Sequence, residues 1–263
     1  MHEELSITIV VYRNYSEVED AVKSIERFTD SSIKKEIFIV DNSGEHSMHL
    51  KECIDFQHYL SQYPDVTYLN PERNLGFGQG NNYVLDKLDS DFHAIVNPDI
   101  LLHEDVFSVL LEYMKQHPDV GMCIPNMVDA DGERQMVYRR ELTIFDMFIR
   151  MFCPCLFPKR MAWHTMQDMD YSAPFHVPFG QGSFLVIRTD LFKKLRGFDD
   201  RYFMYLEDAD LSKRVNQCSK LMYCPSVTVV HKWKKGSHKN LTLFKYHIES
   251  MWEYFKKWGF KWF

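Results

Sequence analysis

The chain has 263 residues, of which 45% are hydrophobic and 26% charged, and its net charge at pH 7 is -6. This composition supports a sizeable core and excludes global disorder, and it argues against a nucleic-acid binder, which would usually carry a strongly basic face. The sequence contains no apolar run of about 18 residues and no basic, apolar leader, so we expect a cytoplasmic protein without a membrane span. Six cysteines include no C-x-x-C pair, which favours reduced thiols over a zinc site.

Strand and helix patterns alternate through the first half of the chain. Apolar, β-branched runs predict strands at 5–12, 36–40, 66–69, 94–96 and 120–124, and helical spacing of apolar residues predicts helices at 16–28, 47–62, 76–88 and 104–116. This rhythm predicts an α/β fold with a mainly parallel sheet and helices on both faces. Ligands of such sheets bind beyond the carboxyl ends of the strands.

Polar side chains gather at four of these strand ends, which indicates one shared crevice. They are Tyr12-Arg13-Asn14, Asp41-Asn42, Arg73-Asn74 and Asn97-Pro98-Asp99.

The second half is less regular. A turn is predicted at 129–132, strands at 184–187 and 227–230, and helices at 207–218 and 241–258. Residues 141–175 are rich in aromatic residues and methionine and show no sustained period. We expect them to form a long, partly mobile segment that helps to select a ligand.

Asn97-Pro98-Asp99 is the first group of residues with chemical meaning. A carboxylate just beyond a buried strand can hold a hard divalent cation such as Mg²⁺, together with phosphate oxygens of a ligand. The alternative is an ordinary strand-to-turn transition, which this tripeptide alone does not exclude.

A glycine-rich stretch, Arg73 to Asn82, is the second group. Glycines allow the backbone to approach a ligand, and a helix N-terminus attracts phosphate. The stretch resembles a loose dinucleotide fingerprint, but it follows the third predicted strand rather than the first.

Acidic residues at the start of the predicted helix 207–218 form the third group. Glu207, Asp208 and Asp210 follow directly after aromatic residues, and a carboxylate in an aromatic-lined cleft can act as a general base. The alternative is a solvated acidic first turn, which the helix dipole favours. His231 and the lysines at 232, 234 and 235 follow the last strand, where imidazole can bind a metal and lysine a diphosphate.

Five motifs, in this order and spacing, resemble the family 2 glycosyltransferases of the GT-A fold, in particular their bacterial rhamnosyltransferase-like branch. That branch builds surface polysaccharides such as O-antigen and capsule. The motifs are V-D-N-S at 40–43, R-N-L-G-F-G-Q-G-N-N at 73–82, N-P-D at 97–99, F-G-Q-G-S-F at 179–184 and G-F-D-D-R-Y-F-M-Y-L-E-D-A-D-L at 197–211.

The resemblance implies a role for each matching residue. It implies that Asp208 is the catalytic base with Glu207 beside it, and that Asp99 and His231 hold a divalent metal, Mg²⁺ or Mn²⁺. Gln181, Gly182 and Asp210 would contact the donor sugar and the acceptor, and the nucleotide would be bound by Tyr12, Asn14, Asp41, Arg73, Asn74, Gly76 and Asn97. Asn97 replaces the first carboxylate of the usual Asp-x-Asp pair, so we expect a weaker metal site.

The resemblance also implies the domain plan and the reaction. A GT-A domain would span 1–240, with a Rossmann-like nucleotide-sugar-binding half (1–125) and an acceptor half (126–240). The expected reaction is an inverting transfer of L-rhamnose from dTDP-L-rhamnose to a hydroxyl of a glycan or a lipid-linked oligosaccharide. A UDP-hexose or UDP-N-acetylhexosamine donor, a non-catalytic nucleotide- or glycan-binding module and a dinucleotide oxidoreductase stay open as alternatives. The last is disfavoured because no glycine fingerprint follows the first strand.

The segment 241–263 is an aromatic, basic amphipathic helix. Phe244, Trp252 and Phe255 fall near one helical face, accompanied by Lys245 and Lys256. Such a helix either lies in a lipid interface on the inner face of the cell membrane or packs on the domain itself or on a second copy in a homodimer. The sequence does not separate these outcomes.

Overall fold

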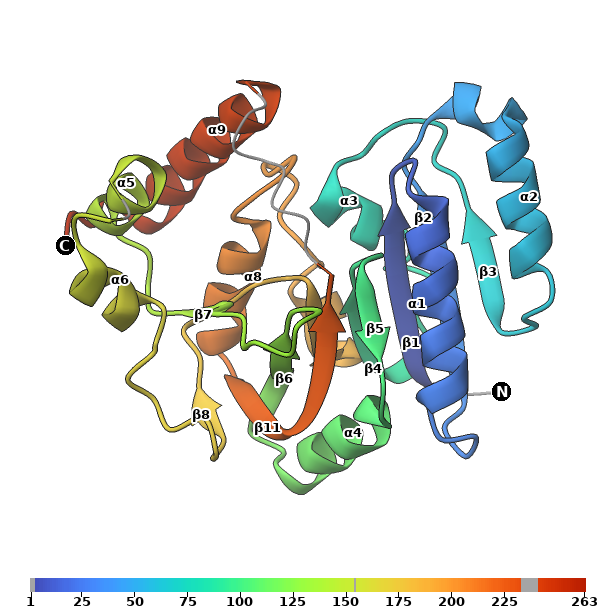
Figure 1. Cartoon of the computed structure of the whole chain (residues 1–263), viewed down its shortest axis with the longest axis horizontal. Coiled ribbons are helices and arrows are strands. Elements are labelled where there is room, and N and C mark those ends of the chain that lie inside the picture. Colours follow the sequence, from blue (N-terminus) through green and yellow to red (C-terminus); the bar gives the residue numbers. More distant parts are fainter. Residues whose placement is uncertain (1–2, 154, 233–240) are drawn as a thin grey trace.

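A mixed nine-stranded sheet runs through the centre of the protein, and helices cover both of its faces (Figure 1). The computed structural model describes residues 3–153, 155–232 and 241–263. The strand order is β3-β2-β1-β4-β10-β6-β11-β5, with β8 paired to β11. A small second sheet joins β7 to β9.

The first half of the chain forms the elements that its hydrophobic pattern predicts. They are β1 (Glu3–Val11), α1 (Tyr15–Phe28), β2 (Lys35–Asp41), η1 (Glu45–His49), α2 (Lys51–Leu60), β3 (Val66–Leu69), α3 (Phe77–Asn82), β4 (Ser90–Val96), α4 (Val106–Gln116) and β6 (Val120–Val128). The short helix η1 is not predicted, and α2 and α3 are clearly shorter than the helices predicted at 47–62 and 76–88.

Parallel pairing holds through this half, from β3 through β2 and β1 to β4. The predicted parallel character is then interrupted by antiparallel strands, among them the short strand β8 beside β11. β10 (Phe184–Arg188) inserts antiparallel between β4 and β6, and β5 (Ile100–Leu102) runs antiparallel to β11 (Lys220–His231). β11 is parallel to β6.

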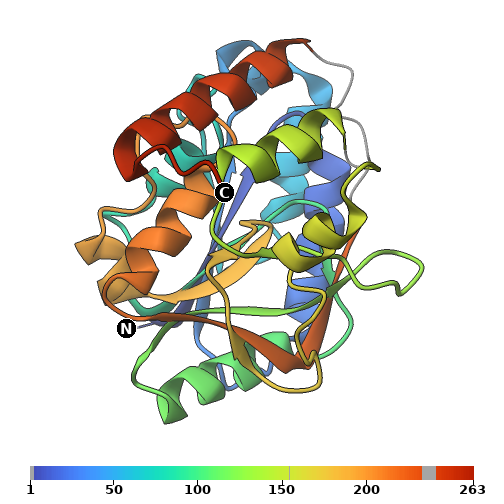
Figure 2. The ribbon, with the colours of Figure 1, turned by 90° about the vertical axis from the view of Figure 1, so that its left-hand side faces the viewer.

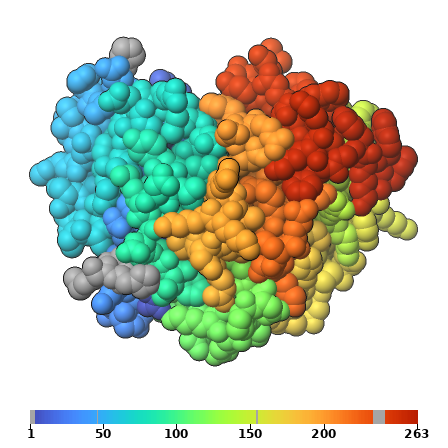
Figure 3. Space-filling model, turned by 180° about the vertical axis from the view of Figure 1, so that it is seen from behind, coloured from blue at the N-terminus to red at the C-terminus, as the bar shows by residue number. Residues whose placement is uncertain are grey.

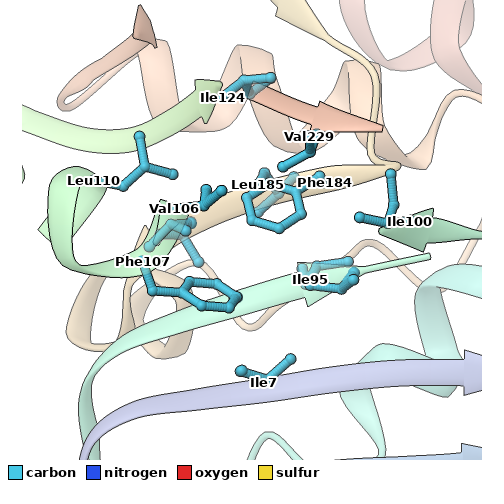
Figure 4. Close-up of a cluster of buried hydrophobic side chains, with 14 of the residues drawn as sticks. Ile7, Ile95, Ile100, Val106, Phe107, Leu110, Ile124, Phe184, Leu185 and Val229 are labelled. Carbon is cyan, nitrogen blue, oxygen red and sulfur yellow. The ribbon is translucent and has the colours of Figure 1, made fainter. Parts of the chain in front are cut away.

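Fully buried aliphatic and aromatic side chains lock these layers together. Ile7 and Ile95 from neighbouring strands, Phe184 from β10 and Phe107 from α4 meet in one cluster (Figure 4). The rings of Phe107 and Phe184 stack with centroids 5.6 Å apart. This cluster joins the two halves of the sheet, so the carboxyl end of β4 and the start of β10 are fixed relative to each other.

The second half contains α5 (Ile144–Phe152), α6 (Pro158–His164), α7 (Thr189–Lys194), α8 (Glu207–Asn216), β7 (Tyr138–Arg139), β8 (Phe175–His176) and β9 (Phe179–Gly180). The expectation of an irregular segment at 141–175 is therefore wrong for much of its length. Thr143 caps α5 by accepting a 3.1 Å hydrogen bond from the N–H of Asp146, and Pro158 occupies the first turn of α6.

Helix α9 (Leu241–Trp258) packs on the second half of the chain. Its Tyr254 and Phe255 are buried in a second hydrophobic cluster with Tyr202, Leu206 and Ala209. The residues after α9 turn back toward α5, where the carbonyl of Lys261 accepts a 2.9 Å hydrogen bond from the N–H of Ile144 (Figure 2). Within the described ranges, no helix has the length and apolarity needed to cross a membrane.

Seen from behind, the two halves of the chain meet along one continuous contact (Figure 3). The blue-to-green first half presents α3 there, against the orange segment that precedes α8. The backbone of the two segments is joined where the N–H of Phe77 donates to the carbonyl of Phe203 over 3.2 Å.

Candidate functional site

The carboxyl end of β4 and the end of β11 bring Asp99 and His231 together. Nε2 of His231 lies 3.4 Å from Oδ1 of Asp99, and the N–H of Lys232 donates to the Asp99 carbonyl over 2.9 Å. The imidazole is buried, and its Nδ1 is 2.8 Å from Oε1 of Gln135. Gln135 thus orients the ring so that Nε2 faces the carboxylate.

Polar oxygens at this strand end fit a divalent cation. Oδ1 of Asn97 and Oδ1 of Asp99 are both buried, and neither has a hydrogen-bond partner in the described residues. Buried oxygens are rarely left unsatisfied. Together with the imidazole nitrogen 3.4 Å from Asp99, they offer oxygen and nitrogen donors for a divalent cation. No group of three or more His, Cys, Asp or Glu side chains with metal-binding geometry occurs in the described chain. In general, Mg²⁺ combines one or two protein carboxylates with phosphate oxygens of a substrate.

Helix α8 begins with a strained turn. Tyr205 and Leu206 have φ values of 73° and 65°, a left-handed conformation that costs non-glycine residues about 1–3 kcal/mol each. Neighbouring elements hold this turn in place. Ser250 of α9 donates to the carbonyl of Met204 over 2.8 Å, and Leu206 packs in the second hydrophobic cluster. Tertiary contacts therefore hold the strained turn, and the turn sets the orientation of the first residues of α8.

Asp208 is held at this helix start by backbone donors. Its Oδ2 accepts a 3.0 Å hydrogen bond from the N–H of Gly182, and its Oδ1 accepts one of 2.8 Å from the N–H of Ala209. Burial raises the pKa of the Asp208 carboxyl above its ordinary value, while the Gly182 N–H and the charge of Arg139 oppose the rise. A carboxylate with a raised pKa suits a general base.

Glu207 lies beside Asp208 but is buried. Burial, reinforced by the Asp208 charge, holds the pKa of the Glu207 carboxyl well above its usual range, and its Oε2 has no hydrogen-bond partner in the described residues. The two adjacent carboxyl groups thus differ in character: Glu207 favours its neutral form and Asp208 is the one that can accept a proton.

One short loop connects the two candidate centres. The N–H of Asn97 donates to the carbonyl of Ser183 over 2.8 Å, and the adjacent Gly182 binds Asp208. Asn97 and Asp208 therefore contact adjacent residues of the 181–183 loop, and Asp99 follows Asn97 by two residues. Gln181, whose N–H donates to the Val137 carbonyl over 3.1 Å, is partly exposed within this loop.

Two arginines near Asp208 carry no recognisable motif and are missed by the sequence patterns. Arg139 of β7 and Arg150 of α5 both interact electrostatically with the Asp208 carboxylate. Arg139 is only 8% exposed, and burial lowers its pKa to about 9. The sequence offers one weak signal for them. Arg139 and Arg150 lie shortly before and shortly after residue 141, where the segment predicted to be irregular begins.

The predicted nucleotide contacts at the first two strand ends differ in exposure. Tyr12 is half exposed, with the guanidinium of Arg13 5.2 Å from its ring centre, and Asn14 is exposed. Asp41 is fully buried, and its carboxylate accepts hydrogen bonds from the hydroxyls of Tyr15 and Tyr68 over 3.0 and 2.7 Å. Asp41 thus supports the strand end from beneath and presents no free face to a ligand.

The glycine-rich stretch contains glycines that allow close packing and polar side chains that are exposed to solvent. Gly76 has φ 80°, and a Cβ there would lie 2.0 Å from the carbonyl oxygen of Phe203. A Cβ at Gly80 would lie 2.8 Å from Val10. These glycines therefore let α3 approach β1 and the turn before α8. Arg73 and Asn74 are exposed, and Oδ1 of Asn74 accepts the Gly76 N–H over 2.9 Å.

Asp210 is predicted as a sugar contact, but the structure places its carboxylate beneath α9. Trp258 Nε1 and Lys257 Nζ lie 2.8 and 2.6 Å from Oδ1, and Nε of Arg214 lies 2.7 Å from Oδ2. The side chain is fully buried. Asp210 follows Asp208 by two residues, about 200° around the helix axis, so its side chain lies on nearly the opposite face of α8 and the structure does not bring this predicted sugar contact together with Asp208.

Two further features lie apart from these centres. The lysines at 234 and 235, expected to contact a diphosphate, lie outside the described residues. A cavity of about 430 Å³ lined by Gln79, Asn82, Phe198 and Arg214, among others, includes neither Asp99 nor Asp208.

Known proteins similar to this chain include two bacterial rhamnosyltransferases. The N-acetylglucosaminyl-diphospho-decaprenol L-rhamnosyltransferase of Mycobacterium tuberculosis is 26% identical over 245 residues, which cover 88% of this chain and 76% of that protein. Rhamnosyltransferase WbbL of Escherichia coli K12 is 27% identical over 251 residues, covering 90% of this chain and 88% of WbbL.

Two solved structures share the fold. GalNAc-T7, crystallised with UDP, GalNAc and Mn²⁺, has a TM-score of 0.66 at 17% identity; the match covers 95% of this chain and 48% of that one. The mannosyltransferase PcManGT of Pyrobaculum calidifontis, in complex with GDP-mannose and Mn²⁺, has a TM-score of 0.60 at 15% identity, covering 90% and 59%. The chain thus spans about half the length of these structures. Both are GT-A glycosyltransferases, so the predicted GT-A fold is confirmed.

The family model described as glycosyl transferase family 2 matches residues 6–196, well over half of the chain. That range contains the strand end with Asn97 and Asp99 and the 181–183 loop, whereas α8, which begins at Glu207, lies beyond it. The predicted hexosyltransferase activity is confirmed at this level, and the chain belongs to glycosyl transferase family 2, the inverting glycosyltransferases.

Proposed function

We propose that this protein transfers L-rhamnose from dTDP-L-rhamnose to a hydroxyl group of a lipid-linked glycan in the synthesis of a bacterial surface polysaccharide such as O-antigen or capsule. The observation that carries the proposal is the 181–183 loop. Ser183 accepts the N–H of Asn97 and the adjacent Gly182 donates to Asp208, which supports a donor-binding region and an acceptor-binding region beside the same loop.

In the proposed reaction the acceptor hydroxyl lies against Asp208. The carboxylate takes the hydroxyl proton as the oxygen attacks the anomeric carbon from the face opposite the leaving group. One displacement breaks the bond between the anomeric carbon and the diphosphate oxygen and inverts the anomeric centre. The Gly182 N–H keeps Oδ2 of Asp208 in place, so the proton is accepted at a defined position.

Asn97, Asp99 and His231 would hold a divalent cation at the donor end. The two unsatisfied buried oxygens and the imidazole nitrogen 3.4 Å from Asp99 support this assignment. When bound, Mg²⁺ or Mn²⁺ would neutralise the negative charge that develops on the departing nucleoside diphosphate.

Tyr12, Asn14, Arg73 and Asn74 are exposed and remain our candidates for contacts to the nucleotide. Asp41 would act through the strand end that it supports. The rhamnosyl donor and the lipid-linked acceptor are proposed by similarity to the two rhamnosyltransferases, one of which is named for an N-acetylglucosaminyl-diphospho-lipid acceptor.

An aromatic surface formed by α5, α6 and the end of the chain would place the protein on the membrane. Its exposed members are Phe148, Phe152, Leu156, Phe157, Trp163, Phe260, Trp262 and Phe263. Lys159 of α6 and Lys256 of the adjoining helix α9 are exposed, which favours an anionic lipid surface over a second protein copy. Because Tyr254 and Phe255 face the domain, α9 contributes only its outer face.

A thermal-shift panel followed by transfer assays tests the function. The protein is heated with dTDP-L-rhamnose, UDP-glucose, UDP-N-acetylglucosamine or NAD, each with and without Mn²⁺ or Mg²⁺. We expect the largest rise in Tm with dTDP-L-rhamnose and metal, and rhamnosyl transfer to an N-acetylglucosaminyl-diphospho-lipid acceptor. Preference for a UDP-sugar would contradict the donor, stabilisation by NAD alone would contradict the enzyme class, and sugar-nucleotide binding without any transfer would indicate a binding module.

Flotation with anionic liposomes tests the membrane contact. Phe148→Ser and Trp262→Ser together should reduce the floated fraction, whereas Tyr83→Ser, an exposed aromatic residue outside the aromatic surface, should not. Unchanged flotation with loss of a dimer in sedimentation would assign the surface to a second copy instead.

A further inference from the structure

Two arginines beside Asp208 lack the partners that buried guanidinium groups normally have. Neither Arg139 nor Arg150 forms an ion pair or a side-chain hydrogen bond within the described residues, and Nε of Arg139 is a buried donor without an acceptor. Arg139 is more than nine-tenths buried. The centre of the Phe179 ring lies 5.1 Å from its guanidinium carbon.

The nearby acidic groups are already engaged. Asp146 binds Arg160 through two hydrogen bonds of 2.6 and 2.8 Å and also accepts the hydroxyl of Thr143. Asp208 accepts two backbone N–H groups. The arginines thus interact with Asp208 through space without a direct bond to it.

The charges at this place do not balance. Asp208 supplies one negative charge against two positive ones, and its neighbour Glu207 favours the neutral form because burial raises its pKa. His164 adds no charge at neutral pH, since burial lowers its pKa to about 4. A buried site with an uncompensated positive charge is costly unless an anion enters it.

The elements that carry the two arginines indicate where such an anion would lie. Arg139 belongs to β7, which pairs with β9 directly before the 181–183 loop. Arg150 belongs to α5, whose Phe148 and Phe152 are exposed and in ring contact with each other. Two cations therefore lie between the catalytic carboxylate on one side and an apolar helix face on the other.

We propose that Arg139 and Arg150 bind the phosphate or diphosphate group of a lipid-linked acceptor. The guanidinium groups would bind the phosphate oxygens, the sugar hydroxyl would reach Asp208, and the lipid chain would leave along Phe148 and Phe152. Guanidinium groups are well suited to phosphate because their donors match its geometry. This inference rests on the proposed function, since it assigns the acceptor end of the same site.

The donor diphosphate is the other source of such an anion. The acceptor is favoured because both arginines interact electrostatically with Asp208, the group that would meet the acceptor hydroxyl. The donor charge is assigned to the strand end that carries Asn97 and Asp99.

Paired acceptors separate these sources. Wild type, Arg139→Gln, Arg150→Gln and the control Arg140→Gln are assayed with N-acetylglucosaminyl diphospho-undecanol and with the uncharged undecyl N-acetylglucosaminide. Arg140 neighbours Arg139 in the chain but binds Asp168 through two 2.8 Å hydrogen bonds, so its substitution leaves the proposed site intact. Transfer is measured above the acid limb of the pH profile, so that Asp208 is ionised in every variant.

We expect wild type and Arg140→Gln to prefer the diphosphate acceptor, and each site variant to lose about 10- to 100-fold of that preference through a higher acceptor KM. This range corresponds to one charged hydrogen bond of about 1.5–3 kcal/mol. Arg150→Lys should retain part of the preference because it keeps the charge. Equal losses with both acceptors, or a raised donor KM with an unchanged acceptor KM, would overturn the proposal.

A binding measurement separates this proposal from the proposed function. Titration with undecyl diphosphate in the presence of saturating dTDP and Mg²⁺ should stabilise wild type and not Arg139→Gln or Arg150→Gln. Arginine-dependent binding without any transfer would support the anion site and contradict the transferase assignment. Transfer by the wild type without arginine-dependent binding would support the transferase assignment and contradict the anion site.

Discussion

The backbone N–H of Gly182 donates a 3.0 Å hydrogen bond to Oδ2 of Asp208, and the adjacent Ser183 accepts one from the N–H of Asn97. The position of the candidate base is therefore fixed by the same loop that contacts the strand end carrying the candidate metal ligands. A change in that loop should disturb proton transfer without unfolding the protein.

Gly182→Ala tests this dependence. A Cβ at Gly182 would lie 3.1 Å from the Cβ of Asp208 and 3.4 Å from the Phe77 ring, so Asp208 must shift to accommodate it. Because small misplacements can cost about 10²-fold in rate, we expect kcat to fall about 10- to 100-fold while the donor KM changes little. Gly132→Ala is the contrasting variant. It strains a turn with φ 84° far from any neighbour, so it should lower Tm and leave kcat unchanged.

The pH dependence of kcat/KM should report Asp208. The base works only when ionised and burial raises its pKa, so the acid limb should lie above the ordinary aspartate value of about 3.9. The charge of Arg139 favours the carboxylate, so Arg139→Gln should raise the pKa further and move the limb to higher pH. Arg140→Gln should leave it in place. A limb that stays or moves to lower pH in Arg139→Gln would contradict the assignment of Asp208.

Glu207→Gln should stabilise the protein increasingly as pH rises. The folded state holds the Glu207 proton to higher pH than the unfolded state, so wild-type stability falls as pH rises above the unfolded glutamate pKa. The neutral glutamine is free of this loss. Each unit of pKa difference is worth about 1.4 kcal/mol, or about 3–5 °C in Tm. Between pH 5 and 9, the Tm of Glu207→Gln minus the Tm of wild type should increase as pH rises. A difference that does not change with pH would exclude a buried neutral Glu207.

Asp210→Asn should destabilise the protein rather than impair sugar binding. The substitution removes a buried carboxylate from Lys257 and Arg214, and breaking such pairs costs about 3–5 kcal/mol. Tm should fall markedly, whereas the donor KM measured below Tm should be close to that of wild type. Asp200→Asn, at an exposed position, serves as control. A raised donor KM with an unchanged Tm would restore Asp210 as a sugar contact.

The sheet could be predicted from sequence because its strands are apolar runs with local signals. The helices α5 and α6 were also within reach, since Thr143 and Pro158 are ordinary helix-start residues. The antiparallel insertion of β10 could not be predicted, because it depends on pairing with β4 and β6, which are distant in the sequence.

The candidate site divides in the same way. Asp99 lies just beyond strand β4, and Asp208 lies in the first turn of helix α8. Both positions therefore follow from local sequence patterns. Asp41 and Asp210 have similar local patterns, but tyrosines and α9 side chains distant in sequence occupy their carboxylates. Arg139 and Arg150 reach Asp208 only through the packing of β7 and α5, and no spacing in the sequence records that contact.

The most direct test of the account is the turnover of Asp208→Asn, measured together with its affinity for dTDP-L-rhamnose and metal. Asparagine keeps the size of the side chain but cannot accept the acceptor proton. The account predicts that kcat falls about 10²- to 10⁴-fold, the usual contribution of one general base, while donor affinity stays near the wild-type value. Near-normal turnover at wild-type donor affinity would contradict it.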